Sequence, residues 1–193
     1  MIKRISDYLT NRLVYASDGN ISEREIYSYG FEYIFSLTLS IIVVIVTALV
    51  LDVRVEALGF IIGFATLRGS SGGYHSSTHL MCQITSFAVF LIAMLSSNYI
   101  SYLRPSMVVM ICTLLSLIVF ELAPIEHKNR PFSHKEFTKF KRMSRIKVLI
   151  MSFICVIGYM FIDHSGFFVG MLLSMIIVTI SVFLAYMLER RVL

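Results

Sequence analysis

Hydrophobic residues along the chain occur in long blocks rather than at the two-residue or three-to-four-residue spacing of a soluble core. Two of these blocks, residues 33–51 and 167–188, contain no charged residue. Each is long enough to cross a bilayer as an α-helix, which takes about 20 apolar residues. We therefore predict an all-α, polytopic membrane helical bundle with about six crossing helices. The six predicted crossings are residues 33–51, 55–67, 80–97, 105–123, 146–162 and 167–188.

The second block, residues 55–67, is the weakest candidate for a crossing, because it is shorter than a full span. Three structures fit its length: a tilted helix, a helix that extends through its flanks, and a re-entrant segment. Gly59 and Gly63 form a G-x-x-x-G pattern, which favours close packing of one membrane helix against another. The same pattern is compatible with a homodimer.

Composition strengthens the membrane assignment, since 57% of the residues are hydrophobic and only 15% are charged. The net charge of +5 does not indicate nucleic-acid binding, because the lysine and arginine residues lie between the hydrophobic blocks, where they meet lipid headgroups. Residues 1–30 alternate charged and apolar positions and lack the apolar core of a signal peptide. We predict that they form an amphipathic cytosolic segment.

Eight of the 17 lysine and arginine residues lie in the segment 124–147. Basic loops stay on the cytosolic side of a membrane, so the segment 124–147 is predicted to be a cytosolic loop. Six crossings then place both termini in the cytosol as well, together with the segment 68–79. The whole chain, residues 1–193, is predicted to be one domain of a bacterial cell membrane protein.

The segment 68–82 joins two hydrophobic blocks, is neither hydrophobic nor a simple charged loop, and reads Arg-Gly-Ser-Ser-Gly-Gly-Tyr-His-Ser-Ser-Thr-His-Leu-Met-Cys. Gly72 and Gly73 permit positive φ, and the hydroxyl residues that follow are favourable N-cap residues. We expect a loop from Arg68 and a helix that starts near Thr78. Cys82 would then lie in the first helical turn, where the positive end of the helix dipole favours its thiolate.

His75 and Cys82 are candidates for a catalytic pair, because a loop can fold the imidazole back onto the first turn of the following helix. Backbone N–H groups at Gly72 and Gly73 are candidates for an oxyanion hole. Arg68 either pairs with headgroups or holds a substrate carboxylate or a loop carbonyl.

Two other interpretations of these residues stay open at this point. In the first, His75 and Cys82 only pack at the membrane interface, as Cys112 and Cys155 are expected to do within their hydrophobic blocks. In the second, His75, His79 and Cys82 share one face of a helix that starts earlier and bind a metal. The glycines argue against that early start, so we expect no metal and no cofactor.

The Gly72-Gly73-Tyr74-His75 block with Cys82 seven residues after the histidine resembles the accessory gene regulator protein B (AgrB) family. The segment from Ala123-Pro124 to Asn129-Arg130-Pro131 and the layout of the hydrophobic blocks support the resemblance over nearly the whole chain. The family's members are membrane endopeptidases of quorum sensing that process an AgrD-like propeptide. The resemblance implies a thiol protease in which His75 and Cys82 are catalytic and an autoinducing peptide is released as a thiolactone or lactone.

The match is incomplete at several positions that bear on function. Ser76 follows the histidine where many members have alanine, and His127 and Asn129 interrupt the basic loop residues Lys128 and Arg130, which are the substrate-binding candidates. The group that would orient His75 is not identified, and its candidates are Glu121 and Asn129. A transporter or export component is the alternative function, since several crossings and a basic cytosolic loop would be sufficient for it.

Overall fold

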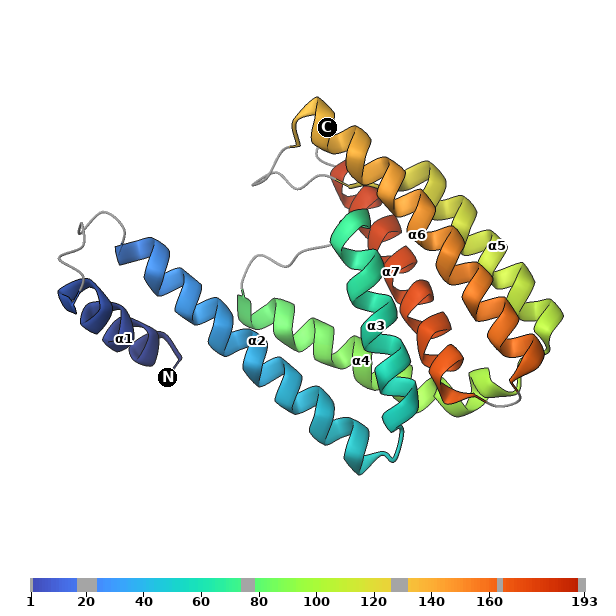
Figure 1. Cartoon of the computed structure of the whole chain (residues 1–193), viewed down its shortest axis with the longest axis horizontal. Helices are drawn as coiled ribbons and strands as arrows, with labels where there is room; N and C mark the ends of the chain where they lie inside the picture. The colour runs from blue at the N-terminus through green and yellow to red at the C-terminus, as the bar shows by residue number, and fades with distance from the viewer. Residues whose placement is uncertain (1, 17–23, 74–78, 126–131, 163–164, 191–193) are drawn as a thin grey trace. The chain divides into compact units, whose positions relative to one another are not determined.

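The protein is described by a computed structural model that covers residues 2–16, 24–73, 79–125, 132–162 and 165–190 (Figure 1). These residues form seven helices and no strand, which confirms the all-α prediction. Residues 1–47 and 48–193 form two compact units, and each is described by itself. The helices are α1 (Ile2–Ala16), α2 (Arg24–Val50), α3 (Arg54–Ser71), α4 (His79–Ser101), α5 (Pro105–Leu122), α6 (His134–Phe161) and α7 (Gly166–Arg190).

The first unit pairs the amphipathic helix α1 with the beginning of α2 in an antiparallel arrangement. The Ser6 hydroxyl donates to the carbonyl of Ser28 (2.6 Å), and the Ser28 hydroxyl donates to the carboxylate of Asp7 (3.1 Å). Farther along α1, the side chain of Asn11 accepts a 2.9 Å bond from Arg24. The predicted N-terminal segment is therefore a helix with polar contacts to α2.

Four helices are long and apolar enough to cross a membrane within the part of the chain that the structure describes. The apolar part of α2 described there, Thr38–Val50, is shorter. The protein is thus a helical membrane protein, and the count of six crossings stays a prediction. The four spans are Gln83–Ser101, Pro105–Leu122, His134–Phe161 and Gly166–Leu188.

The weak second block is part of α3, an 18-residue helix that extends beyond the predicted residues 55–67 at both ends. Of the three structures considered from the sequence, the helix that extends through its flanks agrees with this length. The loop was predicted to begin at Arg68. It begins four residues later, because the segment from Arg68 to Ser71 is helical. Tertiary hydrogen bonds to the last carbonyls of α3, described below, stabilise this final turn.

Helices α3 and α7 run parallel and touch closely through the glycines of the G-x-x-x-G pattern. A Cβ atom on Gly59 would collide with the backbone of Phe167, and one on Gly63 would collide with the side chain of Ser174. From the other side, Gly170 of α7 has no room for a Cβ beside the backbone of Glu56. The predicted close packing is confirmed. Because α7 of the same chain covers this glycine face, the pattern no longer supports a homodimer, which stays a prediction.

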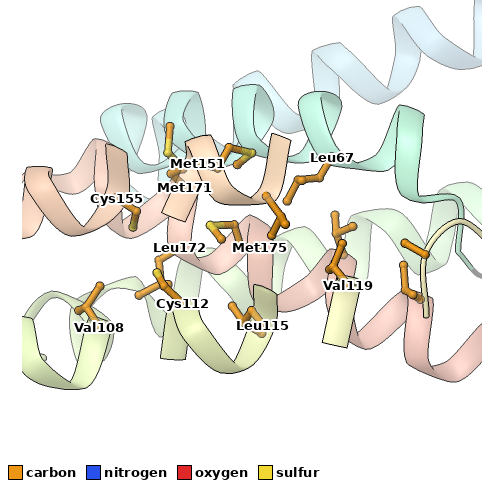
Figure 2. Packing of buried hydrophobic residues seen from close by; sticks show 14 of the residues in the cluster. Leu67, Val108, Cys112, Leu115, Val119, Met151, Cys155, Met171, Leu172 and Met175 are labelled. Carbon is orange, nitrogen blue, oxygen red and sulfur yellow. The ribbon is translucent and has the colours of Figure 1, made fainter. Parts of the chain in front are cut away.

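The core of the second unit lies between α3, α5, α6 and α7 and contains both of the cysteines expected to be packing residues (Figure 2). Cys112 and Cys155 are buried, and neither is in a disulfide. The Cys155 thiol donates weakly to the carbonyl of Phe168 on α7 (3.6 Å). Leu67, Leu172 and Met175 belong to the same buried cluster. The packing interpretation of Cys112 and Cys155 is therefore confirmed.

Much of the segment 124–147, predicted as a basic loop, is the first part of α6. The helix begins at His134, directly after an N-cap formed by Ser133. The Ser133 hydroxyl accepts from the backbone N–H of Glu136 (3.4 Å), and the Glu136 carboxylate accepts from the backbone N–H of Ser133 (2.9 Å). This capping box starts a helix that continues into the membrane span without a break, so its basic residues lie on a rigid element.

The ends of α3, α5 and α7 and the beginning of α6 meet at one end of the second unit, which we call the Gly72 end. Arg68 at the end of α3 contacts Ser181 of α7, and Arg145 of α6 contacts the carbonyl of Phe120 near the end of α5. Segments predicted to share one side of the membrane are therefore close in space. That this side is cytosolic stays a prediction.

Candidate active site

A turn of two glycines follows α3 and begins the segment in which the catalytic residues were predicted. Gly72 and Gly73 have positive φ angles of 69° and 124°. Such angles are unfavourable for residues with a Cβ. A Cβ would also lack space, since it would collide with the carbonyl of Ile125 at Gly72 and with the guanidinium of Arg68 at Gly73. Both positions therefore require glycine for conformational and steric reasons.

Arg68 holds this turn against α7. Its Nη1 atom donates to the carbonyl of Gly72 (2.9 Å) and to the hydroxyl of Ser181 (2.8 Å). Of the roles considered for Arg68 from the sequence, the observed contact is the one with a loop carbonyl. Ser181 was not predicted, because a single serine in an apolar helix carries no signal of a contact 113 positions away.

The Arg68 contact fixes the orientation of the peptide group between the two glycines. In a trans peptide, the carbonyl of one residue and the N–H of the next point in opposite directions. Because the Gly72 carbonyl points to Arg68, the N–H of Gly73 points away from the guanidinium. The turn thus presents a backbone donor on the side opposite to Arg68.

Helix α6 and the segment after α5 satisfy three more carbonyls in the last turns of α3. Lys147 Nζ donates to the carbonyl of Thr66 (2.9 Å), and the buried Ser144 hydroxyl donates to that of Ser70 (2.8 Å). The carbonyl of Ser71 accepts from the backbone N–H of Ile125 (3.2 Å). The last four carbonyls of a helix, which here include those of Ser70 and Ser71, lack partners within the helix, so these bonds fix the end of α3 from which the glycine turn projects.

The contact with Ile125 also joins the two sequence blocks that carried the family resemblance. Ala123, Pro124 and Ile125 are buried, and a Cβ on Gly72 would collide with the Ile125 carbonyl. The segment that contains the basic loop therefore leaves the Gly72 end directly beside the glycine turn. Sequence distance hides this proximity, since Gly72 and Ile125 are more than 50 positions apart.

The predicted catalytic pair lies largely outside the described residues. His75 belongs to the segment 74–78, which is outside them, as are Lys128, Asn129 and Arg130. Cys82 lies in the first turn of α4, which begins at His79, one residue after the predicted start, but its side chain is outside the described part. Glu121 is exposed in the last turn of α5.

The metal site considered as an alternative depends on His75, His79 and Cys82, whose side chains are outside the described part of the chain. Within the described residues, no group of three histidine, cysteine, aspartate or glutamate side chains is close enough to hold a metal ion. The polar side chains that are buried in this part of the chain are all serine or threonine. A path of paired charged groups, as in many transporters, is therefore not found among them.

We call the Arg68 bonds to the Gly72 carbonyl and to Ser181 the clamp of the glycine turn. The apolar spanning helices and this clamped turn at one end of the bundle define a polytopic membrane protein with a candidate site at the helix ends. The chain belongs to the accessory gene regulator B family, whose model matches residues 2–190. This match covers both the glycine turn and the start of the basic segment.

Individual relatives agree with the family assignment. An AgrB-like protein 2 of Clostridium perfringens is 27% identical over 173 residues, which are 86% of this chain and 81% of the relative. The accessory gene regulator protein B of Staphylococcus intermedius is 32% identical over 130 residues, 66% of this chain and 68% of the relative. No solved structure matches the chain.

Proposed function

We propose that the protein is a membrane cysteine endopeptidase that removes the C-terminal tail of an AgrD-like propeptide and promotes its cyclisation to an autoinducing peptide of quorum sensing. The observation that carries this proposal is the clamped turn at Gly72 and Gly73. In the chain, the turn is followed at once by His75 and then by the first turn of α4, which contains Cys82. A base, a nucleophile and a fixed backbone donor thus come from one short segment.

The position of Cys82 in the first turn of α4 supports its role as the nucleophile. The N-terminal end of a helix carries partial positive charge, which stabilises a thiolate over a thiol. His75 takes the proton of the Cys82 thiol and holds it as an imidazolium. In other cysteine and serine peptidases a carboxylate or an amide side chain orients the catalytic histidine. Glu121 and Asn129 are the candidates for this group here.

The fixed peptide group supports an oxyanion hole at the N–H of Gly73. Attack on the scissile carbonyl produces a tetrahedral intermediate with a negatively charged oxygen, which backbone N–H groups stabilise best when they are oriented in advance. Arg68 and Ser181 act as positioning residues, because they hold the Gly72 carbonyl and so direct the Gly73 N–H away from themselves. Neither side chain needs to contact the substrate.

The proposed reaction has two steps, acylation of Cys82 and ring closure. The Cys82 thiolate attacks the scissile carbonyl carbon, the peptide C–N bond breaks, and the amine of the tail leaves with the proton held by His75. This step leaves a thioester between Cys82 and the rest of the propeptide. A thiol or hydroxyl within the propeptide then gives its proton to His75 and attacks the thioester carbon, the C–S bond to Cys82 breaks, and a thiolactone or lactone ring is released with Cys82 as a thiolate.

Charge supports a propeptide with an acidic tail as the substrate. Lys128 and Arg130 are the binding candidates in the loop, and the basic residues Lys135, Lys139 and Arg142 continue the positive surface along the exposed part of α6. A basic surface beside the membrane attracts an acidic peptide. The capping box supports this role, because it keeps the first turns of α6 in a fixed position near the Gly72 end.

Trapping of the acyl-enzyme tests the proposal. The protein is reconstituted in lipid vesicles with a propeptide whose ring-closing residue is replaced by alanine, so that the second step is blocked. We expect a covalent adduct with the mass of the propeptide without its tail, released by hydroxylamine and unaffected by a metal chelator. Cleavage without any adduct, or cleavage abolished by the chelator, would contradict the thiol mechanism, and an uncleaved but exported propeptide would favour a transporter.

The positioning role of Ser181 gives a separate prediction. Replacement of Ser181 by alanine removes an acceptor of Arg68 and loosens the Gly72 carbonyl. We expect kcat for tail release to fall about tenfold with little change in KM, because small misplacement of an oxyanion donor weakens only transition-state binding. Steady-state tail release in vesicles measures both constants.

Ser174 provides the matched control, because it lies on the same helix and its hydroxyl bonds to the carbonyl of Met171 within that helix (2.7 Å). Ser174→Ala should leave kcat within about twofold of the unmodified protein, since this bond contributes to neither the turn nor the clamp. An equal loss of kcat in both variants, or a change of KM alone in Ser181→Ala, would show that Ser181 does not position the turn.

A further inference from the structure

A groove with a volume of about 380 Å³ runs between α5 and α6 on an exposed side of the bundle. Its edges are exposed apolar side chains such as Leu117, Leu149 and Phe153. Binding sites for small molecules have volumes of about 300–1,000 Å³ and are lined mostly by apolar groups. The groove therefore has the size and the lining of a site for one apolar chain.

The floor of the groove is formed by small residues from both helices. Ser116 of α5 and Ser152 of α6 form a hydrogen bond of 3.0 Å with each other, and Cys112 lies one turn away from Ser116. Small side chains leave the depression, and each hydroxyl group has the other as a hydrogen-bond partner. An apolar chain can thus lie over the pair without leaving a polar group without a partner.

The groove has a cationic end, which is the Gly72 end of the bundle. Phe120 lines the groove there, and the guanidinium of Arg145 stacks over its ring at 5.1 Å from the centroid. Arg142, Arg145, Leu149 and Ser152 follow one another on α6 at spacings of three and four residues, so they lie on one face of the helix. The charged positions therefore continue the line of the groove.

The guanidinium of Arg145 has a hydrogen-bond donor without a partner among the described residues at this end. Its Nη2 atom donates to the carbonyl of Phe120 (2.9 Å), but its Nε atom is buried and has no hydrogen-bond partner within the described part of the chain. A buried donor without a partner is unfavourable, and the planar guanidinium suits the oxygen atoms of a phosphate. Arg142, one turn earlier, is exposed and adds a second positive charge. At the opposite end the groove is lined by Val109 and Val156, which offer no charge.

We propose that this groove is a binding site for an anionic phospholipid. One acyl chain lies over the Ser116–Ser152 pair, and the phosphate contacts Arg142 and Arg145 at the Gly72 end. Charge complementarity selects this occupant, because a groove that is apolar along its length and cationic at only one end matches an amphiphile with a negative head and an apolar chain. The proposal does not depend on the proposed peptidase activity.

Lipid binding to the purified full-length protein tests the proposal. The protein in a neutral detergent is titrated with dioleoyl phosphatidylglycerol or with dioleoyl phosphatidylcholine, and native mass spectrometry counts the lipids bound to the folded protein. We expect phosphatidylglycerol to bind about tenfold more tightly, since it carries a net negative charge near the two arginines, whereas choline neutralises the phosphate of phosphatidylcholine. Equal binding of the two lipids would overturn the proposal.

Two variants separate the charge from the groove. Arg145→Gln should reduce the preference for phosphatidylglycerol to about twofold. Thr113→Phe should have a similar effect by filling the groove, because Thr113 is an exposed lining residue whose hydroxyl bonds only to the carbonyl of Val109 in its own helix (2.8 Å). Since Thr113→Phe leaves Arg145 and its bond to Phe120 in place, it keeps the test valid if Arg145→Gln is poorly folded.

Matched controls carry the same chemical changes elsewhere. Lys139→Gln removes one positive charge from the exposed side of α6, and Thr38→Phe adds a ring at an exposed threonine of α2 with the same type of bond, to the carbonyl of Ile34. Both should keep the tenfold preference. If all four variants keep it, the lipid binds elsewhere and the proposal fails. If Thr113→Phe instead dissociates a dimer seen in the mass spectrum, the groove holds a second copy of the chain.

Discussion

Replacement of Cys82 by alanine is expected to reduce tail release from the propeptide at least ~1,000-fold, because no other group can form the thioester. The protein should still reach the membrane in normal amounts, since the substitution removes one sulfur atom from an interfacial turn of α4. Co-expression with the propeptide, followed by mass spectrometry of the peptide products, measures the loss.

Cys112→Ala is the control for this prediction. Cys112 is buried in the core between the helices, and its replacement should leave cleavage within about twofold, with a modest loss of stability from the small cavity. Cys82→Ser distinguishes chemistry from packing, because serine preserves shape but is a poor nucleophile without strong activation. Cleavage retained in both Cys82 variants would remove the basis of the proposed enzyme, whatever happens in Cys112→Ala.

The second large effect is expected for Gly73→Ala, which should reduce tail release about 100-fold. Alanine disfavours the φ of 124°, and its Cβ would occupy the position of the Arg68 guanidinium. Relief of this collision displaces Arg68 from the Gly72 carbonyl, so the Gly73 N–H loses its fixed direction. Loss of an oriented oxyanion donor costs about 100-fold to 1,000-fold in other enzymes. Tail release per molecule of membrane protein is the measurement.

Gly69→Ala provides the comparison at a neighbouring glycine. Gly69 is exposed within α3, and a Cβ there meets no atom within 4 Å. Alanine favours a helix over glycine by about 1 kcal/mol, so this variant should be as active as the unmodified protein and somewhat more stable to heat. If Gly69→Ala and Gly73→Ala lose activity equally, the effect of Gly73 does not arise from the clamp.

The membrane helices were predictable because the bilayer imposes a simple rule on sequence. A long apolar block has to be a helix that satisfies its own backbone, and each of the four spans found here overlaps a predicted block. The G-x-x-x-G pattern of Gly59 and Gly63 correctly indicated close packing. It could not identify the partner, since a pattern within one helix says nothing about which surface it meets.

Other features were missed for physical reasons that differ from one place to another. The start of α6 was taken as a loop because positive charge dominated the interpretation, although Ser133 and Glu136 have the spacing of a capping box. The final turn of α3 was missed because its glycine and serine residues favour a loop, and bonds from Ser144 and from the backbone of Ile125 override that preference. Such tertiary contacts leave no local trace in the sequence.

The candidate site was predictable as a segment but not as an assembly. The segment around Gly72 and Cys82 was recognisable as a candidate site because polar residues and glycines separate two apolar blocks there. The side chains that support the turn come from distant helices, and one of them, Ser181, looks like any other small residue of an apolar helix. Contacts of this kind depend on the arrangement of the helices rather than on any motif.

The bond between Arg68 and Ser181 also has a consequence for biosynthesis. A ribosome makes α3 long before α7, so a nascent chain carries the glycine turn through the synthesis of three further helices without its partner on α7. The turn can reach its final geometry only when α7 has entered the membrane beside α3. The oxyanion donor that we propose at Gly73 would therefore be oriented only after α7 is in place.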